Sequence, residues 1–187
     1  MLNYNPIIKE NKSFNELTIK EIVPIMKLNI RGKKREFFTN VGKILNMILP
    51  TEANTSSVND KHTSIWLSPD EWMIHSNDPV KNDNNSYELE ELLYLNVSKN
   101  NLGSVTDITD QFVIINIEGK KVFELLSLGC PLNFNDFKEK EGSTAQTILN
   151  HIDVIIHHKK NNSVNLFVKR SFSEHLWSWI NDAASRL

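Results

Sequence analysis

The sequence is poor in the residues on which disulfide-stabilised, metal-binding and nucleotide-binding proteins depend. It has one cysteine, Cys130, which excludes an intrachain disulfide framework. Six glycines in 187 residues leave little material for a glycine-rich phosphate loop. The sequence has no Walker motif, dinucleotide-binding fingerprint or Gly-x-Ser-x-Gly elbow. We therefore expect no cofactor-binding loop of these kinds.

Long hydrophobic runs and a strong net charge are also missing. No apolar run approaches the roughly 20 residues needed to cross a bilayer, and the first six residues lack the profile of a secretory signal. The net charge is −2, and the basic clusters are short and diluted by acids. Nucleic-acid binders usually carry a dense basic stripe, because phosphate neutralisation supplies much of their affinity. We expect a cytoplasmic protein that binds neither nucleic acid nor membrane.

The chain is long enough, and at 40% hydrophobic residues apolar enough, to build its own core. In the first half, hydrophobic periodicity predicts a strand at about 23–30 and a helix at about 34–47. A hairpin at about 64–74 and a second helix at about 87–99 follow. In the second half we predict a strand at 105–117 that is interrupted near Asp110, and a short helix at 122–126 after Gly119. A charged loop at 134–143 follows, then strands at 147–157 and 164–169 and a last helix at 173–187.

These elements repeat. Residues 29–34 and 116–121 agree in five of six positions at an offset of 87, and that offset also superposes the starts of the two later helices. We predict an α+β fold of two similar strand-helix-strand-strand-helix halves, about 21–104 and 105–187. Neither half has residues to spare for its own core, so we expect both in one domain. Residues 1–20 are predicted to be a loosely docked polar N-terminal arm.

Two carboxylates are the only candidates for a ligand site. Asp107 and Asp110 flank a strand segment and could face a cleft, where they would hold a pterin or an amine. Acidic and hydroxyl residues at a strand junction also commonly bond to the local backbone, and this alternative stays open. Asp70 and Glu71 follow Pro69 in a predicted turn, which is ordinary turn chemistry.

No catalytic residue and no metal site are predicted. His157 and His158 are neighbours in a predicted strand and point to opposite faces, and His151 lies roughly 20 Å from His157 along the same strand. Cys130 follows a helix C-terminus, whose partial negative charge disfavours a thiolate. We expect Cys130 to be a buried structural thiol.

The last helix is predicted to place one tryptophan outside its apolar stripe. That stripe consists of Phe172, Leu176, Trp179, Ile180 and Ala183. Trp177 falls on the opposite face with Glu174 and Asn181. An exposed tryptophan is either unexplained surface or an anchor for another chain. We predict a partner interface at Trp177, Glu174 and Asn181.

Five stretches together resemble the gamma subunit of heterotetrameric sarcosine oxidase. They are Leu67-Ser68-Pro69-Asp70-Glu71-Trp72, Val105-Thr106-Asp107-Ile108-Thr109-Asp110-Gln111, Leu128-Gly129-Cys130-Pro131-Leu132, Ala145-Gln146-Thr147, and Val168-Lys169-Arg170-Ser171-Phe172 with Leu176-Trp177. Their order and spacing are similar to that family from about residue 20 to the end of the chain.

The resemblance implies a fold like the folate-binding fold of glycine-cleavage aminomethyltransferases. It also implies a place in sarcosine catabolism and one-carbon metabolism, since the complex oxidises sarcosine to glycine with hydrogen peroxide and formaldehyde or methylene-tetrahydrofolate. Alpha, beta and delta subunits are the implied partners. FAD, FMN, NAD, zinc and tetrahydrofolate are expected in those subunits, and no cofactor is expected in this chain.

We therefore expect a non-catalytic subunit that supports assembly of an oxidoreductase complex and lacks an active site of its own. Two alternatives stay open at this stage. One is a free-standing folate-binding or one-carbon transfer protein, for which fold analogy is the only support. The other is a generic interaction module with an unrelated partner.

Overall fold

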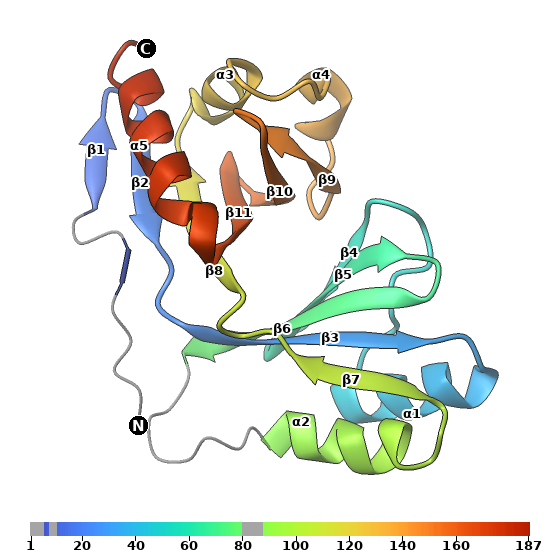
Figure 1. The fold of residues 1–187 in the computed structure, drawn as a ribbon. Coiled ribbons are helices and arrows are strands. Elements are labelled where there is room, and N and C mark those ends of the chain that lie inside the picture. The colour runs from blue at the N-terminus through green and yellow to red at the C-terminus, as the bar shows by residue number, and fades with distance from the viewer. Residues whose placement is uncertain (1–5, 8–10, 80–87) are drawn as a thin grey trace. The chain divides into compact units, whose positions relative to one another are not determined.

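The chain folds into two compact units, drawn in Figure 1 as a computed structural model that describes residues 6–7, 11–79 and 88–187. Unit 2 consists of Pro24–Thr109, and unit 1 combines the segment before Pro24 with Asp110–Leu187. The boundary lies close to the predicted division between residues 104 and 105. That the two halves act as one domain stays a prediction.

Unit 2 contains an antiparallel sheet with the strand order β4-β5-β6-β3-β7. Its strands are β3 (Ile25–Gly32), β4 (Ser56–Val58), β5 (His62–Ser68), β6 (Glu71–Pro79) and β7 (Gly103–Asp107). Helix α1 (Arg35–Leu45), helix α2 (Glu88–Leu93) and the π-helix η1 (Tyr94–Ser98) cover one face. The core forms there because alternate residues of β3 meet the apolar stripe of α1.

Trp72 lies at the centre of this core. Its ring centroid is 5.8 Å from that of Phe37 and 5.4 Å from that of Phe38, and its indole Nε1 donates a 2.7 Å hydrogen bond to the carbonyl of Pro50. Because a buried tryptophan needs a partner for its N–H, this bond fixes the chain just after α1.

Unit 1 contains an antiparallel sheet with the order β1-β2-β8-β11-β10-β9. Its strands are β1 (Lys12–Phe14), β2 (Leu17–Glu21), β8 (Phe112–Glu118), β9 (Thr144–Leu149), β10 (Ile152–Lys160) and β11 (Ser163–Lys169). Its helices are α3 (Val122–Ser127), α4 (Phe134–Phe137), the 3₁₀ turn η2 (Arg170–Phe172) and α5 (Ser173–Ala184). Buried residues of α3 and α5 share a cluster with alternate residues of β8, β10 and β11.

The two sheets repeat one topology, which confirms the α+β class and the two similar halves. The order β4-β5-β6-β3 in unit 2 matches β9-β10-β11-β8 in unit 1. In each half the strand-ending glycine donates its N–H to a hairpin carbonyl: Gly32 to Asp70 (3.0 Å) and Gly119 to Asn162 (3.1 Å). The offset of 87 also superposes β2 on β7, yet β2 pairs with β8 and β7 pairs with β3. Each half therefore gives its first strand to the sheet of the other half.

This exchange overturns the prediction of a loosely docked arm over residues 1–20. Residues 1–5 and 8–10 lie outside the described residues, but β1 and most of β2 belong to the six-stranded sheet. Leu17 and Ile19 are buried in the core of unit 1. The alternation of Leu17 and Ile19 with Thr18 and Lys20 gives β2 one apolar face. The segment is polar on average only because its other face is.

The turn before β2 packs closely on the end of β8. Gly119 has φ +133°, and a Cβ built on it would lie 1.9 Å from the carbonyl oxygen of Glu16. The side chains of Glu16 and Lys120 form a 2.9 Å ion pair at the same place. A residue with a Cβ would push the β1–β2 turn away, so Gly119 is required by the strand exchange itself.

Of the remaining predicted elements, most are confirmed and two are corrected. The helices at 34–47 and 173–187 and the hairpin at 64–74 are confirmed, and the helix at 87–99 is confirmed from residue 88, since 87 is not among the described residues. The strand at 147–157 is wrong, because Asn150 and His151 adopt positive φ and turn the chain between β9 and β10. The loop at 134–143 contains α4. Each half therefore has three strands between its helices, where two were predicted.

Candidate functional site

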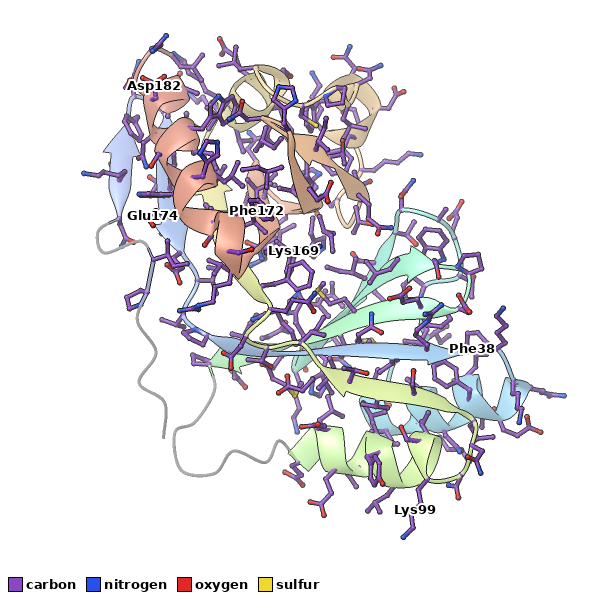
Figure 2. The ribbon with its side chains drawn as sticks, in the orientation of Figure 1. Phe38, Lys99, Lys169, Phe172, Glu174 and Asp182 are labelled. Atoms are coloured by element: carbon purple, nitrogen blue, oxygen red, sulfur yellow. The ribbon has the colours of Figure 1, made fainter. Side chains whose placement is uncertain are left out.

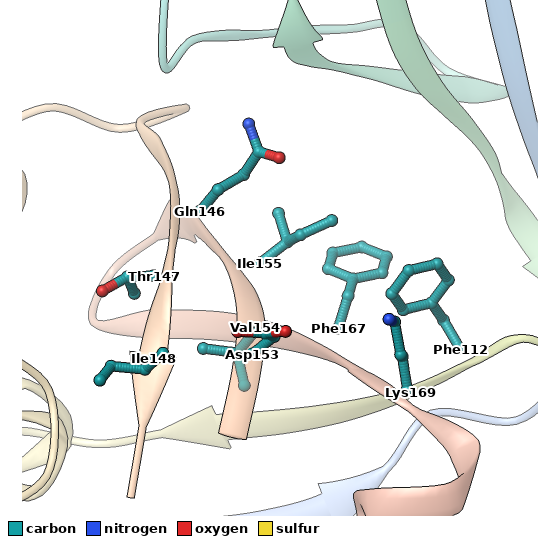
Figure 3. A pocket seen from close by; sticks show the side chains of 9 residues that line it. All are labelled: Phe112, Gln146, Thr147, Ile148, Asp153, Val154, Ile155, Phe167 and Lys169. Atoms are coloured by element: carbon teal, nitrogen blue, oxygen red, sulfur yellow. The ribbon is translucent and has the colours of Figure 1, made fainter. Parts of the chain in front are cut away.

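A groove of about 550 Å³ lies on the face of the unit 1 sheet opposite α3 and α5 (Figure 3). Strand register builds its floor. One row across the strands joins Gln146, Ile155 and Phe167, which are neighbours on β9, β10 and β11. Side chains two residues away along each strand share this face, so Asp153 and Lys169 flank Ile155 and Phe167.

The groove combines an apolar floor with one carboxylate and one ammonium group. Ile155 and Phe167 are buried at its base, while Asp153 and Lys169 are exposed at its edge. Its volume falls in the range of sites for small molecules. Its other lining residues are Phe112, Gln146, Thr147, Ile148 and Val154. The groove thus offers an apolar floor with two opposite charges at its edge, features suited to binding a small molecule.

Both predicted ligand residues lie outside this groove and in different units. Asp107 is exposed at the end of β7, where its Oδ1 accepts a 2.8 Å hydrogen bond from the N–H of Thr109. Thr109 in turn accepts a 3.0 Å bond at its hydroxyl from the N–H of Lys27 on β3. Asp110 is exposed in the turn that leads to β8. Neither carboxylate lines the groove, and the local bond favours the backbone-capping alternative for Asp107.

The negative charge of Asp107 also affects the pKa of Glu90 on α2. Partial burial raises the pKa of Glu90 on α2 above its ordinary value of 4.5, and the negative charge of Asp107 raises it further. Asp70 shows the opposite shift at the β5–β6 turn: a 2.8 Å hydrogen bond from the Ser68 hydroxyl lowers its pKa, and Lys33 and Arg31 lower it further. Asp70 thus performs the turn chemistry expected of it.

Cys130 is buried just after α3, as predicted. Its Sγ lies 3.7 Å from the hydroxyl of Thr147, and it lines a second hollow of about 360 Å³. Ile148 lines both this hollow and the groove. A Cβ built on Gly129 would lie 2.6 Å from the ring of Trp179, so glycine is needed where the loop after α3 meets α5.

The three histidines considered for a metal site lie in unit 1. His157 and His158 are both buried and alternate in direction along β10. The ring of His158 stands edge-on to Phe123, with centroids 5.2 Å apart, and its Nδ1 bonds to the carbonyl of Lys140 at 3.1 Å. His151 lies in the β9–β10 turn. Within residues 6–7, 11–79 and 88–187, no group of three or more His, Cys, Asp or Glu side chains is placed to hold a metal ion.

The expected partner-facing residues have mixed positions on α5 (Figure 2). Glu174 is exposed. Trp177 is half-buried against the core of unit 1, so the expectation that it lies on the solvent side is wrong in part. Asn181 donates a 2.8 Å hydrogen bond to the carbonyl of Trp177. Phe172, expected in the apolar stripe, is 51% exposed because it belongs to the preceding 3₁₀ turn. The partner contact itself stays a prediction.

A family comparison decides the identity of the chain. The model of the sarcosine oxidase gamma subunit family matches residues 32–186. The chain belongs to this family. The match covers all of unit 1 that follows Asp110 except the last residue, and all of unit 2 from the end of β3.

Solved structures show that this gamma subunit family member has a known fold. A chain of heterotetrameric sarcosine oxidase from Corynebacterium sp. U-96 is 20% identical, with a TM-score of 0.81 over 91% of this chain and 84% of that one. Aminomethyltransferase T of the glycine cleavage system from Bartonella henselae is 13% identical, with a TM-score of 0.63 over 91% of this chain and 49% of that one. The aminomethyltransferase-like fold is therefore confirmed. Among curated proteins, none matches the sequence.

The groove on this gamma subunit family member was not found from the sequence. The alternation Asp153–Ile155–His157 and Asn165–Phe167–Lys169 was available as a signal for a second apolar sheet face. The predicted strand at 147–157 merged β9 with β10, so the cross-strand rows could not be drawn.

In the described part of the chain, no helix is long and apolar enough to span a bilayer.

Proposed function

We propose that this chain is the non-catalytic gamma subunit of a heterotetrameric sarcosine oxidase and that it supports assembly of the complex. The match of the gamma subunit family to residues 32–186 carries the proposal. The complex would oxidatively demethylate sarcosine to glycine, with hydrogen peroxide and formaldehyde or methylene-tetrahydrofolate as the other products.

The proposed partners are the alpha, beta and delta subunits of the same complex. FAD, FMN, NAD, zinc and tetrahydrofolate would then be held by those subunits. The proposed compartment is the cytoplasm, in keeping with a single, buried and unpaired cysteine.

Omission of the chain tests the proposal. The four subunits of the source organism are co-expressed with and without it, and the purified material is assayed for subunit composition and for sarcosine-dependent hydrogen peroxide formation. We expect the alpha, beta and delta chains to assemble incompletely, or to lose turnover, when this chain is missing. Full assembly and full turnover without it would overturn the proposal. The isolated chain should show no turnover.

The α5 surface is the first proposed contact with these partners. Glu174 is its most informative residue, because it is exposed whereas Trp177 also packs on the core. We expect Glu174→Lys to reduce co-purification with the other subunits without changing the melting temperature of the isolated chain. Glu139→Lys, the same charge reversal at another exposed position, is the matched control. Equal behaviour of the two variants would remove α5 from the interface.

A free-standing folate-binding protein is the second candidate, because the fold is shared with aminomethyltransferase T. Calorimetric titration of tetrahydrofolate into the isolated chain separates the two. Binding at micromolar ligand that Asp107→Asn or Asp110→Asn weakens would favour this candidate. Absence of heat at millimolar ligand would eliminate it.

A further inference from the structure

The helical segment α2–η1 of unit 2 exposes three large apolar side chains. Leu92, Tyr94 and Leu95 are 43%, 54% and 41% exposed, and we call these three residues the α2 patch. Their neighbours Leu93 and Val97 are fully buried against the sheet. The segment thus packs one face on the core and leaves these three apolar side chains exposed.

A π-turn holds the patch in place. The N–H of Lys99 bonds to the carbonyl of Tyr94 at 2.9 Å, five residues back, and side-chain amides take up neighbouring carbonyls: Asn96 bonds to Leu92 at 2.8 Å and Asn100 to Leu95 at 3.1 Å. One such turn inserts an extra residue and turns the side chains beside it, and π-turns occur frequently at functional sites. The backbone under the patch is therefore fixed by several bonds.

The internal repeat allows α2–η1 to be compared with α5, the equivalent helix of the other half. The offset of 87 places Leu89, Leu93 and Val97 of α2–η1 on Leu176, Ile180 and Ala184 of α5, and each of the α5 residues is buried. The same offset places Tyr94 and Leu95 on Asn181 and Asp182.

On α5 these two outer positions are polar. Asp182 pairs with Arg186 at 2.8 Å and is exposed (Figure 2). The same element in the same topology thus carries polar residues at these two positions, so the fold does not require Tyr94 and Leu95 to be apolar. Leu92 differs, because the offset places it on Trp179, which is half-buried against the core of unit 1. Isolated patches of this kind on a surface mark interaction sites.

The rim of the patch is acidic. Glu88 and Glu91 are exposed in the first turn of α2, and Glu90 lies half-buried in the same turn. Two lysines lie near the far end of the segment: Lys99 follows η1 (Figure 2), and the ammonium of Lys34 donates a 3.3 Å hydrogen bond to the carbonyl of Asn101. A second copy of this chain would bring the same excess of carboxylates. A surface with an apolar centre and a Lys/Arg rim would instead match both the patch and its surroundings.

We propose that the α2 patch is a docking surface for another subunit of the complex, which contacts it through an apolar centre surrounded by lysine and arginine. This inference rests on the proposed function and adds a contact on unit 2 to the one proposed on α5. Tyrosine and leucine side chains at the centre would be shielded from water by the charged pairs around them, which is the usual arrangement at subunit contacts.

Leu95→Asp tests the proposal, because it places on unit 2 the residue that unit 1 carries at the same position. Leu128→Asp is the matched control, since Leu128 is also an exposed leucine and lies outside the patch. Each variant of the full chain is co-expressed with the tagged partner subunits, and the apparent Kd is then measured by titrating the purified chain. We expect Leu95→Asp to weaken association about tenfold or more, and Leu128→Asp to match the parent chain. Equal association of the two variants would refute the role of the α2 patch as a docking surface.

A charge-reversal variant tests the proposal independently, in case Leu95→Asp fails to fold. Glu88→Lys combined with Glu91→Lys changes only exposed side chains, and we expect it to weaken association and to reduce its salt dependence. Stronger association of this variant would overturn the basic rim. Concentration-dependent dimerisation of the isolated chain, abolished by Leu95→Asp with no effect on the complex, would assign the patch to a second copy. Failure of the parent chain to bind any partner subunit refutes the proposed function instead.

Discussion

Ile19→Ala probes the strand exchange most directly. Ile19 is fully buried in the core of unit 1, although the chain reaches it before the first residue of unit 2. Its partner in the sheet is Ile117 of β8. Truncating a buried isoleucine to alanine removes the transfer free energy of the lost atoms and leaves a cavity, which together cost about 2–5 kcal/mol. That is a large part of the roughly 5–15 kcal/mol by which a domain is usually stable.

Urea unfolding measures this loss, followed by circular dichroism and by hydrogen exchange in peptides from each unit. We expect peptides from β8, β10 and β11 to lose protection first, while those from β3 and β6 keep theirs. Thr18→Ala is the control, since Thr18 is exposed on the other face of the same strand and should cost less than about 0.5 kcal/mol. If Ile19→Ala costs no more than Thr18→Ala, β2 is not part of the sheet and the exchange is refuted.

Three further substitutions test other parts of the fold. Gly119→Ala should destabilise unit 1 by about 2–4 kcal/mol in urea unfolding, because φ is +133° and the new Cβ would meet backbone 1.9 Å away; a loss under about 1 kcal/mol would contradict this packing. Trp72→Phe should cost about 1–3 kcal/mol in unit 2, since it leaves the carbonyl of Pro50 buried without its indole donor, and an unchanged urea midpoint would speak against that bond. Glu90→Gln should raise the melting temperature at pH 7, because burial and Asp107 raise the pKa of Glu90 and so disfavour its charged form in the folded state. That gain should vanish as pH falls below the ordinary value of 4.5, where the acid is neutral in both states; a gain that persists at pH 3 would rule out a charge effect.

Local periodicity was sufficient to predict the elements whose partners lie nearby. The stripe of Phe37, Val41 and Leu45 predicts α1, and all three residues are buried in unit 2. Strand β2 shows the limit of such signals. Its alternation of Leu17 and Ile19 with polar residues is only five residues long, and its partner β8 begins at residue 112. A short strand with so distant a partner cannot be recognised from its own composition.

The candidate site was less predictable than the fold, for two physical reasons. Asp107 and Asp110 were selected by residue type, but the carboxylate of Asp107 is used by the N–H of Thr109 two residues on. The groove exists only because register sets Asp153 and Lys169 beside one apolar row. Register depends on where each strand turns. In the β9–β10 turn His151 adopts φ +66°, and a histidine in a sequence does not indicate such a left-handed conformation.

The exchange of first strands also sets an order of events during synthesis. Unit 2 has all of its strands once residue 107 has been made, whereas β2 must wait from residue 21 to residue 112 for its partner strand. At about 5–20 residues per second this interval is roughly 5–20 s, far longer than a hairpin needs to form. During it, two apolar side chains stand on an unpaired strand in the nascent chain. Lys12, Glu16, Lys20 and Glu21 lie on or beside these strands, and charges in such positions discourage pairing with other chains. The polar character of this segment thus protects it until β8 emerges.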